Sequence, residues 1–218
     1  DDFEMEFGCN HLAHFLLMRE LVPLLLKTAE TTNKPSRFVA LSSVAAAHST
    51  MSKEPANIDF DDLNWEKREY NEGVAYGASK LANYLHAKEA AKLYPADKLI
   101  STSVHPGWVQ SNLDVHAFKK MFGDGFFGKV ASDAVRNVFK LKGDMISPVD
   151  GAQTTLHCLL EDASSMQSGA FYSQFGIYRD PKAAAGGWPL EEGLPNSNVT
   201  EDMPTKLWVE SEKLVGIK

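Results

Sequence analysis

The chain has 218 residues, of which 44% are hydrophobic and 23% charged, an ordinary composition for a globular protein with a sizeable core. The formal net charge of −7 argues against a surface built to neutralise phosphates, so we expect no nucleic-acid partner. Two cysteines are too few for a disulfide framework, and no apolar run reaches the length of a membrane-spanning helix.

The first third of the chain predicts a long helix followed by a buried strand. Apolar residues recur at three- and four-residue steps over 3–30, and we expect Pro23 to kink this helix without ending it. Residues 38–41 form a short apolar run that is typical of a buried parallel strand. Residues 49–70 are polar and acidic, which indicates a surface excursion.

The rest of the chain continues to alternate between strands and long helices. The expected elements are a helix over about 73–93, a strand over 100–104, a helix from Pro148, a strand over 169–172 and a helix over 203–214. A mixed segment rich in Phe, Gly and Lys lies between the second strand and Pro148. This alternation predicts an α/β fold with a parallel sheet.

The stretch GDGFFGK matches the G-x-G-x-x-G pattern of dinucleotide-binding turns through Gly123, Gly125 and Gly128. Such a turn must follow a strand and open a helix, whereas this stretch follows a predicted helix. We interpret the match as accidental. The glycines fit a bending lid better, with Phe122, Phe126 and Phe127 facing a lipophilic substrate.

The stretch AYGASKLAN places Tyr76 and Lys80 four residues apart, on one face of the second long helix. A nearby ammonium favours the phenolate and lowers the pKa of a tyrosine, so such a pair can exchange a proton with an alcohol oxygen. Tyr-x-x-x-Lys is also a common surface pair. The spacing alone therefore leaves a catalytic and a structural interpretation open.

Three further stretches favour catalysis. Ser43 closes the strand FVALSS, where its hydroxyl could hydrogen-bond a substrate oxygen, and Asn10 lies on the first helix, where its amide could hold a water. HPGWVQS follows the next strand at its carboxyl end, where open α/β sheets bind their ligands. The joint pattern is far more specific than any one part of it.

These residues resemble the short-chain dehydrogenase/reductase family: Asn10 in NHLAHF, Ser43 in SSVA, Tyr76 and Lys80 in YGASK, and Pro106-Gly107 in HPGWVQS. FEMEFGCNHLAHFLL, IDFDDLNW and GAQTTLHCLLED are similar to the retinol dehydrogenase-like branch, which includes WW-domain oxidoreductases and protochlorophyllide reductases. The tail LWVESEKLVG is similar to the end of the protochlorophyllide reductases.

The resemblance implies a role for each matched residue. Tyr76 would be the general acid/base, and Lys80 would lower its pKa. Ser43 would orient the substrate carbonyl, and Asn10 would hold a water in the proton relay. The implied cofactor is NADP, with NAD not excluded, and the residues expected to bind it are Tyr76, Lys80, Pro106, Gly107, Val109 and Ser111.

The resemblance also implies a Rossmann-like, doubly wound parallel sheet. The family's glycine-rich turn and first strands have no counterpart here, so we expect a single domain over 1–218 that is incomplete at its amino terminus, with the first remaining strand at an exposed edge. Within it we expect a substrate loop or lid over 112–144 and a carboxyl-terminal tail and helix over 175–218.

The expected function is NADP(H)-dependent interconversion of a lipophilic alcohol and carbonyl. The alternatives are a protochlorophyllide reductase-like enzyme and a non-catalytic dehydrogenase-like subunit. Trp108 stands where the protochlorophyllide reductases have a cysteine. We expect no metal site, because His11 and His14 lack a third ligand nearby. A homo-oligomer or a larger assembly remains open, and we expect a soluble intracellular protein of the cytoplasm or of an organelle such as the plastid.

Overall fold

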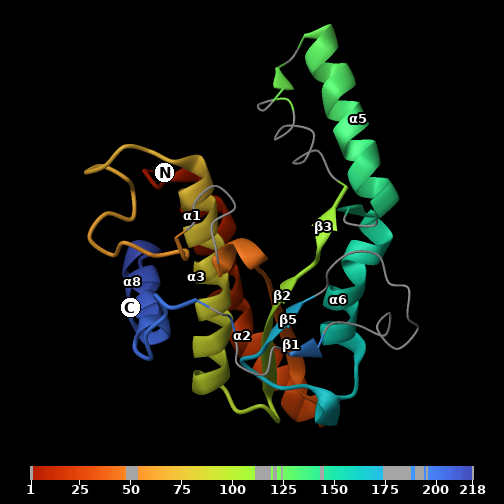
Figure 1. The fold of residues 1–218 in the computed structure, drawn as a ribbon. Coiled ribbons are helices and arrows are strands. Elements are labelled where there is room, and N and C mark those ends of the chain that lie inside the picture. Colours follow the sequence, from red (N-terminus) through yellow and green to blue (C-terminus); the bar gives the residue numbers. More distant parts are fainter. Residues whose placement is uncertain are drawn as a thin grey trace.

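The computed structural model describes residues 2–47, 54–110, 119, 122–123, 125–142, 145–173, 188–189, 194 and 196–217. A four-stranded sheet in the order β1-β2-β5-β6 lies at its centre (Figure 1). Its strands are β1 (Ser36–Leu41), β2 (Leu99–His105), β5 (Phe171–Ser173) and β6 (Trp188–Pro189). β1, β2 and β5 run parallel, and β6 is antiparallel to β5. The predicted α/β fold with a parallel sheet is confirmed.

The register of β1 and β2 brings the ends of both strands to the same edge of the sheet. Ser36 lies opposite Leu99, and Leu41 lies opposite Val104. The backbone N–H of Ser42 donates to the Val104 carbonyl at 2.8 Å, so the pairing extends one residue past β1. Among the described strands β1 pairs only with β2, and it therefore forms an edge of this sheet, as predicted.

Helices cover both faces of the sheet (Figure 1). Phe15 of α2 (Ala13–Thr32) and Ala90 of α3 (Glu72–Leu93) pack around Leu99 of β2. Cys158 of α6 (Pro148–Leu160) packs with Val104 of the same strand. Leu99 and Val104 are an odd number of positions apart, so their side chains point to opposite faces. The core is thus divided into two layers by β2, all of whose residues are buried.

The first predicted helix forms, but it contains an irregular turn. It runs through α1 (Met5–Phe7), a π-helical turn η1 (Gly8–Leu12) and α2, and Asn33 ends it with a left-handed φ of 54°. Pro23 lies inside α2 and does not end it, as predicted. A π-helical turn inserts one residue into the helical ladder, and such turns are frequent at functional sites.

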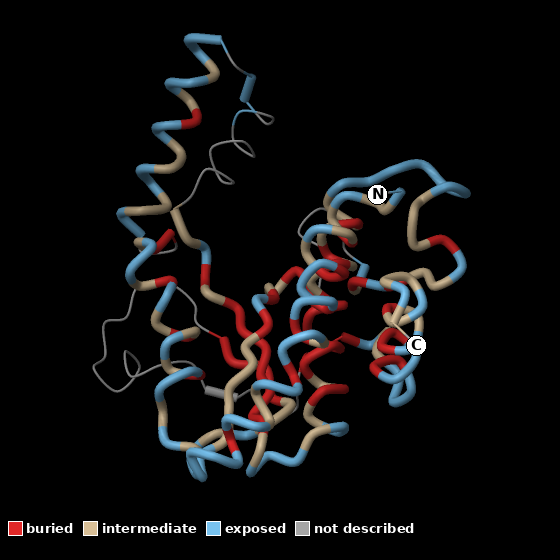
Figure 2. Tube along the Cα trace, turned by 180° about the vertical axis from the view of Figure 1, so that it is seen from behind, coloured by how far each residue is buried: buried red, intermediate tan, exposed pale blue. Residues whose placement is uncertain are grey.

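The second predicted helix, α3, begins with a side-chain cap. The Asn71 side-chain oxygen accepts the Val74 N–H at 3.1 Å, which satisfies one of the unpaired donors of the first turn. Small buried residues such as Ala75, Ala82 and Ala87 let α3 approach its neighbours closely. The buried trace in Figure 2 is concentrated in α3 and the central strands, so α3 is the central helix of the core.

The carboxyl-terminal segment packs against α3 and is tied to the loop after β1. Trp208 of α8 (Met203–Leu214) meets Phe15 with ring centroids 5.0 Å apart, and burial of a side chain such as Phe15 contributes about 2 kcal/mol. The buried Asn196 amide donates to the carbonyls of Ala46 and Ala56 at 2.7 and 2.8 Å. We call these two hydrogen bonds the Asn196 clamp.

The segment after β2 holds a helix that the sequence did not predict. Two short strands, β3 (Trp108–Val109) and β4 (Met145–Ile146), pair in parallel, and α5 (Phe126–Lys142) lies between them in the chain. α5 extends away from the rest of the molecule (Figure 1). Of the expected lid over 112–144, residues 112–118, 120–121, 124 and 143–144 lie outside the described part. Residues 54–70 contain no helix, in keeping with the predicted excursion.

Candidate active site

Asn10 lies in the π-helical turn, which turns its side chain toward α3. Its amide Nδ2 donates to Oε2 of Glu6 at 2.6 Å and to Oγ of Ser79 at 3.1 Å. The Ser79 hydroxyl in turn donates to the backbone carbonyl of Tyr76 at 2.8 Å. Asn10 is therefore anchored beside the helical turn that carries Tyr76.

Ser43 lies just after the carboxyl end of β1. Its backbone is extended, and its hydroxyl oxygen accepts the Ala45 N–H at 3.2 Å, which caps the short helix η2 (Val44–Ala46). The side chain also lies close enough to Tyr76 to lower the pKa of its phenol. The strand end and α3 thus bring Ser43 and Tyr76 together.

Lys80 lies one helical turn beyond Tyr76, and its ammonium reaches back toward β1. Nζ donates to the Leu41 carbonyl at 3.3 Å and lies 5.6 Å from the centre of the Tyr76 ring. Asn83, which the sequence analysis did not single out, donates to the same carbonyl at 3.1 Å. Together these contacts bind α3 to the end of β1 at the point where Ser43 follows.

The pKa of Tyr76 differs from the sequence expectation. Burial raises it, the hydrogen bond with Ser43 lowers it, and the Glu6 carboxylate raises it further. Burial also lowers the pKa of Lys80, against the effect of Glu6. The expected lowering of the Tyr76 pKa by Lys80 is not found, because the ammonium lies over the ring and donates to a backbone carbonyl instead of the phenol oxygen.

Glu6 is a charged neighbour of this site that the sequence analysis missed. Burial raises the pKa of its carboxyl group, and Glu4 raises it further, while the Asn10 hydrogen bond and the Lys80 charge lower it. Glu6 precedes Asn10 by four residues, so helical spacing from Asn10 could have identified it. Its charge acts on both Tyr76 and Lys80.

A second Tyr-x-x-x-Lys pair on α3 shows what this spacing does elsewhere. Lys88 Nζ lies 5.7 Å from the Tyr84 ring centre, close to the 5.6 Å of the first pair. Tyr84, however, is buried in the core, where its ring meets Phe171 at 6.0 Å. The spacing alone therefore makes no site, and the Ser43 contact distinguishes Tyr76 from Tyr84.

The turn after β2 adjoins the end of β1. Gly107 is buried and has a φ of 91°, a conformation that a side chain rarely adopts, so glycine is required there. Pro106 and Val109 are partly buried, and Val109 pairs with Ile146 of β4. The structure thus places Pro106 and Gly107 directly after β2, at the edge of the sheet where β1 also ends, and Val109 in β3. Ser111 lies outside the described residues.

The glycine-rich stretch neither follows a described strand nor lines the site. Gly123 has a φ of 85°, and Phe126 and Phe127 begin α5 with exposed fractions of 77% and 86%. Their rings meet each other at 5.7 Å in a T-shaped arrangement. The expectation that they face a substrate finds no support in the described contacts.

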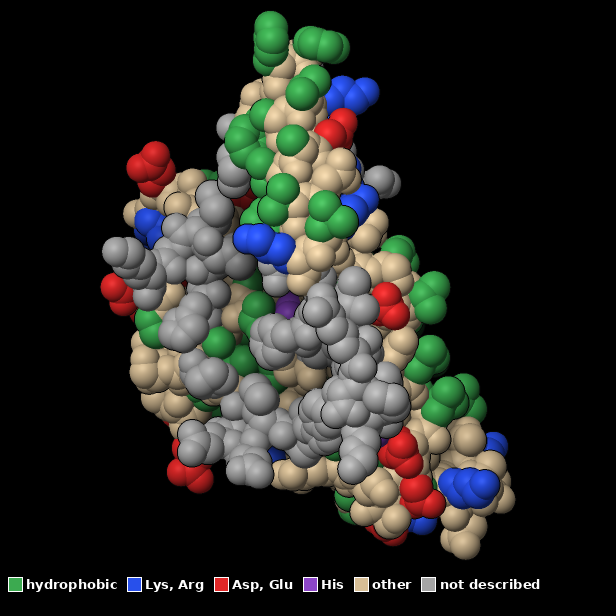
Figure 3. Space-filling model, turned by 45° about the vertical axis from the view of Figure 1, so that its right-hand side comes forward, with side chains coloured by type: hydrophobic (Ala, Val, Ile, Leu, Met, Phe, Trp, Pro, Cys, Tyr) green, Lys and Arg blue, Asp and Glu red, His purple; other side chains and the backbone are tan. Residues whose placement is uncertain are grey.

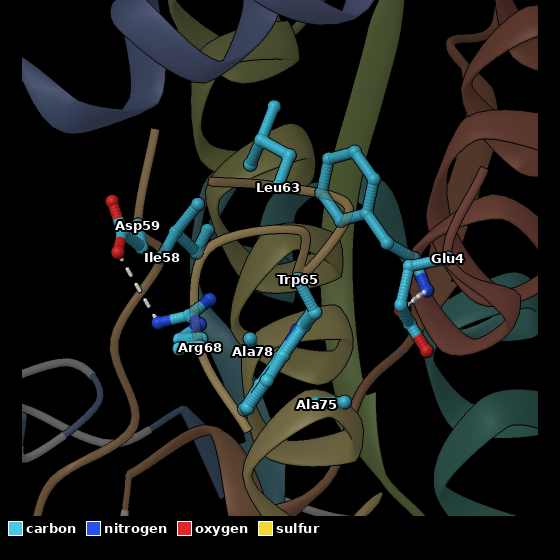
Figure 4. A pocket seen from close by; sticks show the side chains of 9 residues that line it. Glu4, Ile58, Asp59, Leu63, Trp65, Arg68, Ala75 and Ala78 are labelled. Atoms are coloured by element: carbon cyan, nitrogen blue, oxygen red, sulfur yellow. Dashed lines mark hydrogen bonds and ion pairs between the residues drawn. The ribbon is translucent and has the colours of Figure 1, made fainter. Parts of the chain in front are cut away.

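A small pocket lies on a different face of α3 (Figure 4). Ala75 and Ala78 line it, together with the excursion residues Leu63, Trp65 and Arg68. Arg68 stacks over the Trp65 ring at 3.9 Å and pairs with Asp59 at 3.3 Å. Since a helix turns about 100° per residue, Tyr76 and Lys80 point away from this pocket. It belongs to the packing of the excursion.

Neither a metal cluster nor a membrane span is found in the described part of the chain. No group of three side chains there could hold a metal ion, and no described helix has the length and apolarity to cross a membrane. His11 is buried, contacts Ser211 Oγ through Nε2 at 2.8 Å and packs between Phe7 and Phe15. His14 is exposed, and its Nδ1 contacts the Asn10 carbonyl at 2.8 Å.

Comparison with known proteins gives similarities over the whole chain. No protein-family model matches it. Human retinol dehydrogenase 14 is 34% identical over 217 residues, covering 100% of this chain and 54% of the relative. Human retinol dehydrogenase 13 is 32% identical over 219 residues, and human retinol dehydrogenase 11 is 38% identical over 174 residues. The chain spans about half the length of these curated relatives.

One solved structure adds a likeness in fold. It is an uncharacterised protein from Mycobacterium paratuberculosis, with 26% sequence identity and a TM-score of 0.60. The alignment covers 99% of this chain and 60% of that protein.

Proposed function

We propose, since the chain belongs to the short-chain dehydrogenase/reductase family and to its retinol dehydrogenase-like branch, that the complete protein is an NADP(H)-dependent oxidoreductase. Its reaction would interconvert a lipophilic alcohol and the corresponding carbonyl. The single observation that carries the proposal is the position of the Ser43 side chain, close enough to lower the pKa of Tyr76, beside Lys80 at the carboxyl end of a parallel strand. Ligands of open α/β sheets bind at that edge.

The proton chemistry follows from this arrangement. The hydroxyls of Ser43 and Tyr76 are neighbours, so both can donate hydrogen bonds to one carbonyl oxygen and hold it in place. When the carbonyl is reduced, that oxygen gains negative charge, and the Tyr76 phenol gives it a proton. Because Tyr76 is largely buried and its pKa raised, the phenol is protonated at neutral pH and is ready to act as the acid.

The return of the proton to Tyr76 requires a path through neighbouring groups. Asn10 and Ser79 lie next to the Tyr76 turn, and Lys80 carries exchangeable protons close to the Tyr76 ring. We assign Asn10 and Lys80 to this path. In the oxidation of an alcohol the same groups would carry the proton in the opposite direction.

The residues present fit the nicotinamide half of an NADP cofactor. The Lys80 ammonium and the Tyr76 hydroxyl are donors on one helical face, which suits the ribose hydroxyls, and Gly107 carries no side chain that would keep a ring from its backbone. When bound, the cofactor supplies or accepts the hydride. Pro106, Gly107 and Val109 would line its nicotinamide side, and Ser111 would continue that wall.

A mutational series on the complete protein tests the assignment, with NADPH oxidation measured on long-chain aldehydes and retinal. Tyr76→Phe removes the proton donor and should lower kcat by about 10²-fold or more, while weakening NADPH binding less than Lys80→Met does. Lys80→Met should lower kcat and also weaken NADPH binding, because that lysine has both roles. A loss of NADPH affinity in Tyr76→Phe as large as that in Lys80→Met would contradict the proposed division of roles.

The second pair on α3 provides a matched control. Tyr84→Phe and Lys88→Met make the same chemical changes in a pair of the same spacing, eight residues farther along α3, whose ammonium lies 5.7 Å instead of 5.6 Å from the ring centre. We expect both variants to keep the parent kcat and NADPH affinity. If Tyr76→Phe retained the rate of Tyr84→Phe, the proton-transfer role of Tyr76 would be wrong.

A further inference from the structure

The helix α5 carries an apolar face that no described part of the chain covers. Space-filling atoms in Figure 3 show hydrophobic side chains along α5, with Lys and Arg side chains beside them. Figure 2 shows the same helix as mostly exposed or intermediate. Its large exposed apolar residues, with exposed fractions from 49% to 86%, are Phe126, Phe127, Val130, Val138 and Leu141. We call these five residues the α5 stripe.

The stripe is a true helical face and differs from the side that packs on the body. At about 100° per residue the five side chains fall within an arc of about 120°. Ser132, which is buried, and Phe139, which is half-buried, lie outside this arc. The Phe139 ring packs on Trp108 with centroids 4.8 Å apart. Packing on the body therefore accounts for one side of α5 and leaves the stripe unexplained.

Charge around the stripe is the reverse of the charge of the whole chain. α5 carries the basic residues Lys129, Arg136, Lys140 and Lys142 and one acidic residue, Asp133. The chain as a whole has a formal net charge of −7. Basic side chains beside an exposed apolar face are the pattern of a helix that lies in the surface of a bilayer, where the cations meet lipid phosphates.

We propose that α5 docks the protein on a membrane surface rich in anionic lipids, with the α5 stripe inserted among the acyl chains. The adjacent rings of Phe126 and Phe127 form the end of α5 that is farthest from the sheet, so they can reach a flat surface first (Figure 1). A second copy of the chain fits this face less well, because a symmetric contact would bring the basic residues of α5 against themselves. The proposal does not depend on the reaction catalysed.

Vesicle binding by the complete protein tests the proposal, with an environment-sensitive fluorophore on a single introduced cysteine. In a Cys9→Ser background, Val130→Cys places the label on the stripe, and Val149→Cys places it at an exposed position on α6, with exposed fractions of 53% and 76%. Vesicles of phosphatidylcholine with about one third phosphatidylserine should blue-shift the emission at Val130→Cys and leave the Val149→Cys emission unchanged. This readout works even if another segment also holds the protein on the vesicle.

Two double variants separate the apolar and the charged contributions. Phe126→Ser/Phe127→Ser should raise the lipid concentration that is needed for half of the emission shift at least tenfold. Val149→Ser/Leu160→Ser removes equally exposed apolar side chains from α6 and should leave that lipid concentration unchanged. Lys129→Gln/Lys140→Gln should weaken binding to anionic vesicles by about fivefold per lysine and leave binding to pure phosphatidylcholine vesicles unchanged.

Three results would overturn the proposal. The first is no emission shift at Val130→Cys with either vesicle, and the second is the same shift with pure phosphatidylcholine as with anionic vesicles. The third is a dimer in sedimentation that Phe126→Ser/Phe127→Ser dissociates, which would assign the stripe to a second copy.

Discussion

Gly151 offers a sharp test of how α6 positions the turn that we assign to the cofactor. A Cβ atom at Gly151 would lie 2.3 Å from Cγ2 of Val109, 3.1 Å from its Cγ1 and 3.3 Å from its Cβ. Ordinary contact begins at 3.4 Å, so Gly151→Ala requires Val109 to move by about 1 Å. A Val109 rotamer that turns its Cβ hydrogen toward Gly151 would relieve the 2.3 Å contact, but Val109 Cβ itself would stay at 3.3 Å. We therefore expect the backbone of β3 to shift as well.

Two opposing effects set the size of the change in stability. Alanine is favoured over glycine inside a helix by about 1 kcal/mol, while overpacking costs about 1–3 kcal/mol. We expect a net loss of about 1 kcal/mol in the free energy of unfolding. Val109 is held by its pairing with Ile146 and by the Gln110 N–H, which donates to the Ile146 carbonyl at 3.0 Å. The strain should therefore also displace the Gly107 turn and weaken NADPH binding.

Denaturant unfolding and NADPH titration of the complete protein measure both effects. In a Val109→Ala background the two methyl groups are gone, so Gly151→Ala should become stabilising by about 1 kcal/mol. Gly125→Ala is the control, because a Cβ there has nothing within 4 Å. If Gly151→Ala changed stability with the same sign in both backgrounds, the proposed contact with Val109 would be refuted.

Three further predictions concern the pH dependence of stability, the charge of Glu6 and the Asn196 clamp. Burial lowers the pKa of His11 from 6.5 to about 3, so between these pH values the unfolded state binds more protons than the folded state. The free energy of unfolding should therefore be constant above pH 6.5 and decrease as the pH falls below it. His11→Gln should make this decrease smaller in denaturant titrations at a series of pH values. Glu6→Gln removes a charge that raises the pKa of Tyr76, so the limb of the kcat/KM profile set by Tyr76 should move to lower pH; an unmoved limb would contradict this. Asn196→Ala removes the 2.7 Å donor of the buried Ala46 carbonyl and leaves the Ala56 carbonyl only the Asn198 amide at 3.4 Å, so it should cost about 1–3 kcal/mol in thermal or chemical unfolding. An unchanged stability would show that water replaces the Asn196 amide.

Much of the fold could be predicted from the sequence because its signals are local. The last helix, α8, begins and ends where its apolar pattern does, and α3 begins within a residue of the predicted position, next to its Asn71 cap. α5 was missed because its glycines and phenylalanines fit a lid, and its apolar residues face solvent where a helix usually packs on a core. Periodicity reports which face is apolar, and it does not report what covers that face.

Only those residues of the candidate site that belong to sequence motifs could be predicted. Spacing identified Tyr76 and Lys80, and the strand end identified Ser43, but the same spacing also describes Tyr84 and Lys88, which lie elsewhere. The direction of the Tyr76 pKa could not be predicted, because it depends on burial and on the charge of Glu6. Both arise from contacts between α1, η1 and α3 that no single segment encodes.

The Asn196 clamp has a consequence for the order in which the protein is assembled. Its two carbonyl partners, Ala46 and Ala56, precede it by 150 and 140 residues. Ala46 closes the short helix capped by Ser43, so the loop that carries this hydroxyl gains its last hydrogen bond from a residue near the end of the chain. During synthesis from the amino terminus, β1 and its loop emerge long before Asn196 does. The loop after β1 therefore lacks these two hydrogen bonds on the ribosome until Asn196 has emerged and docked.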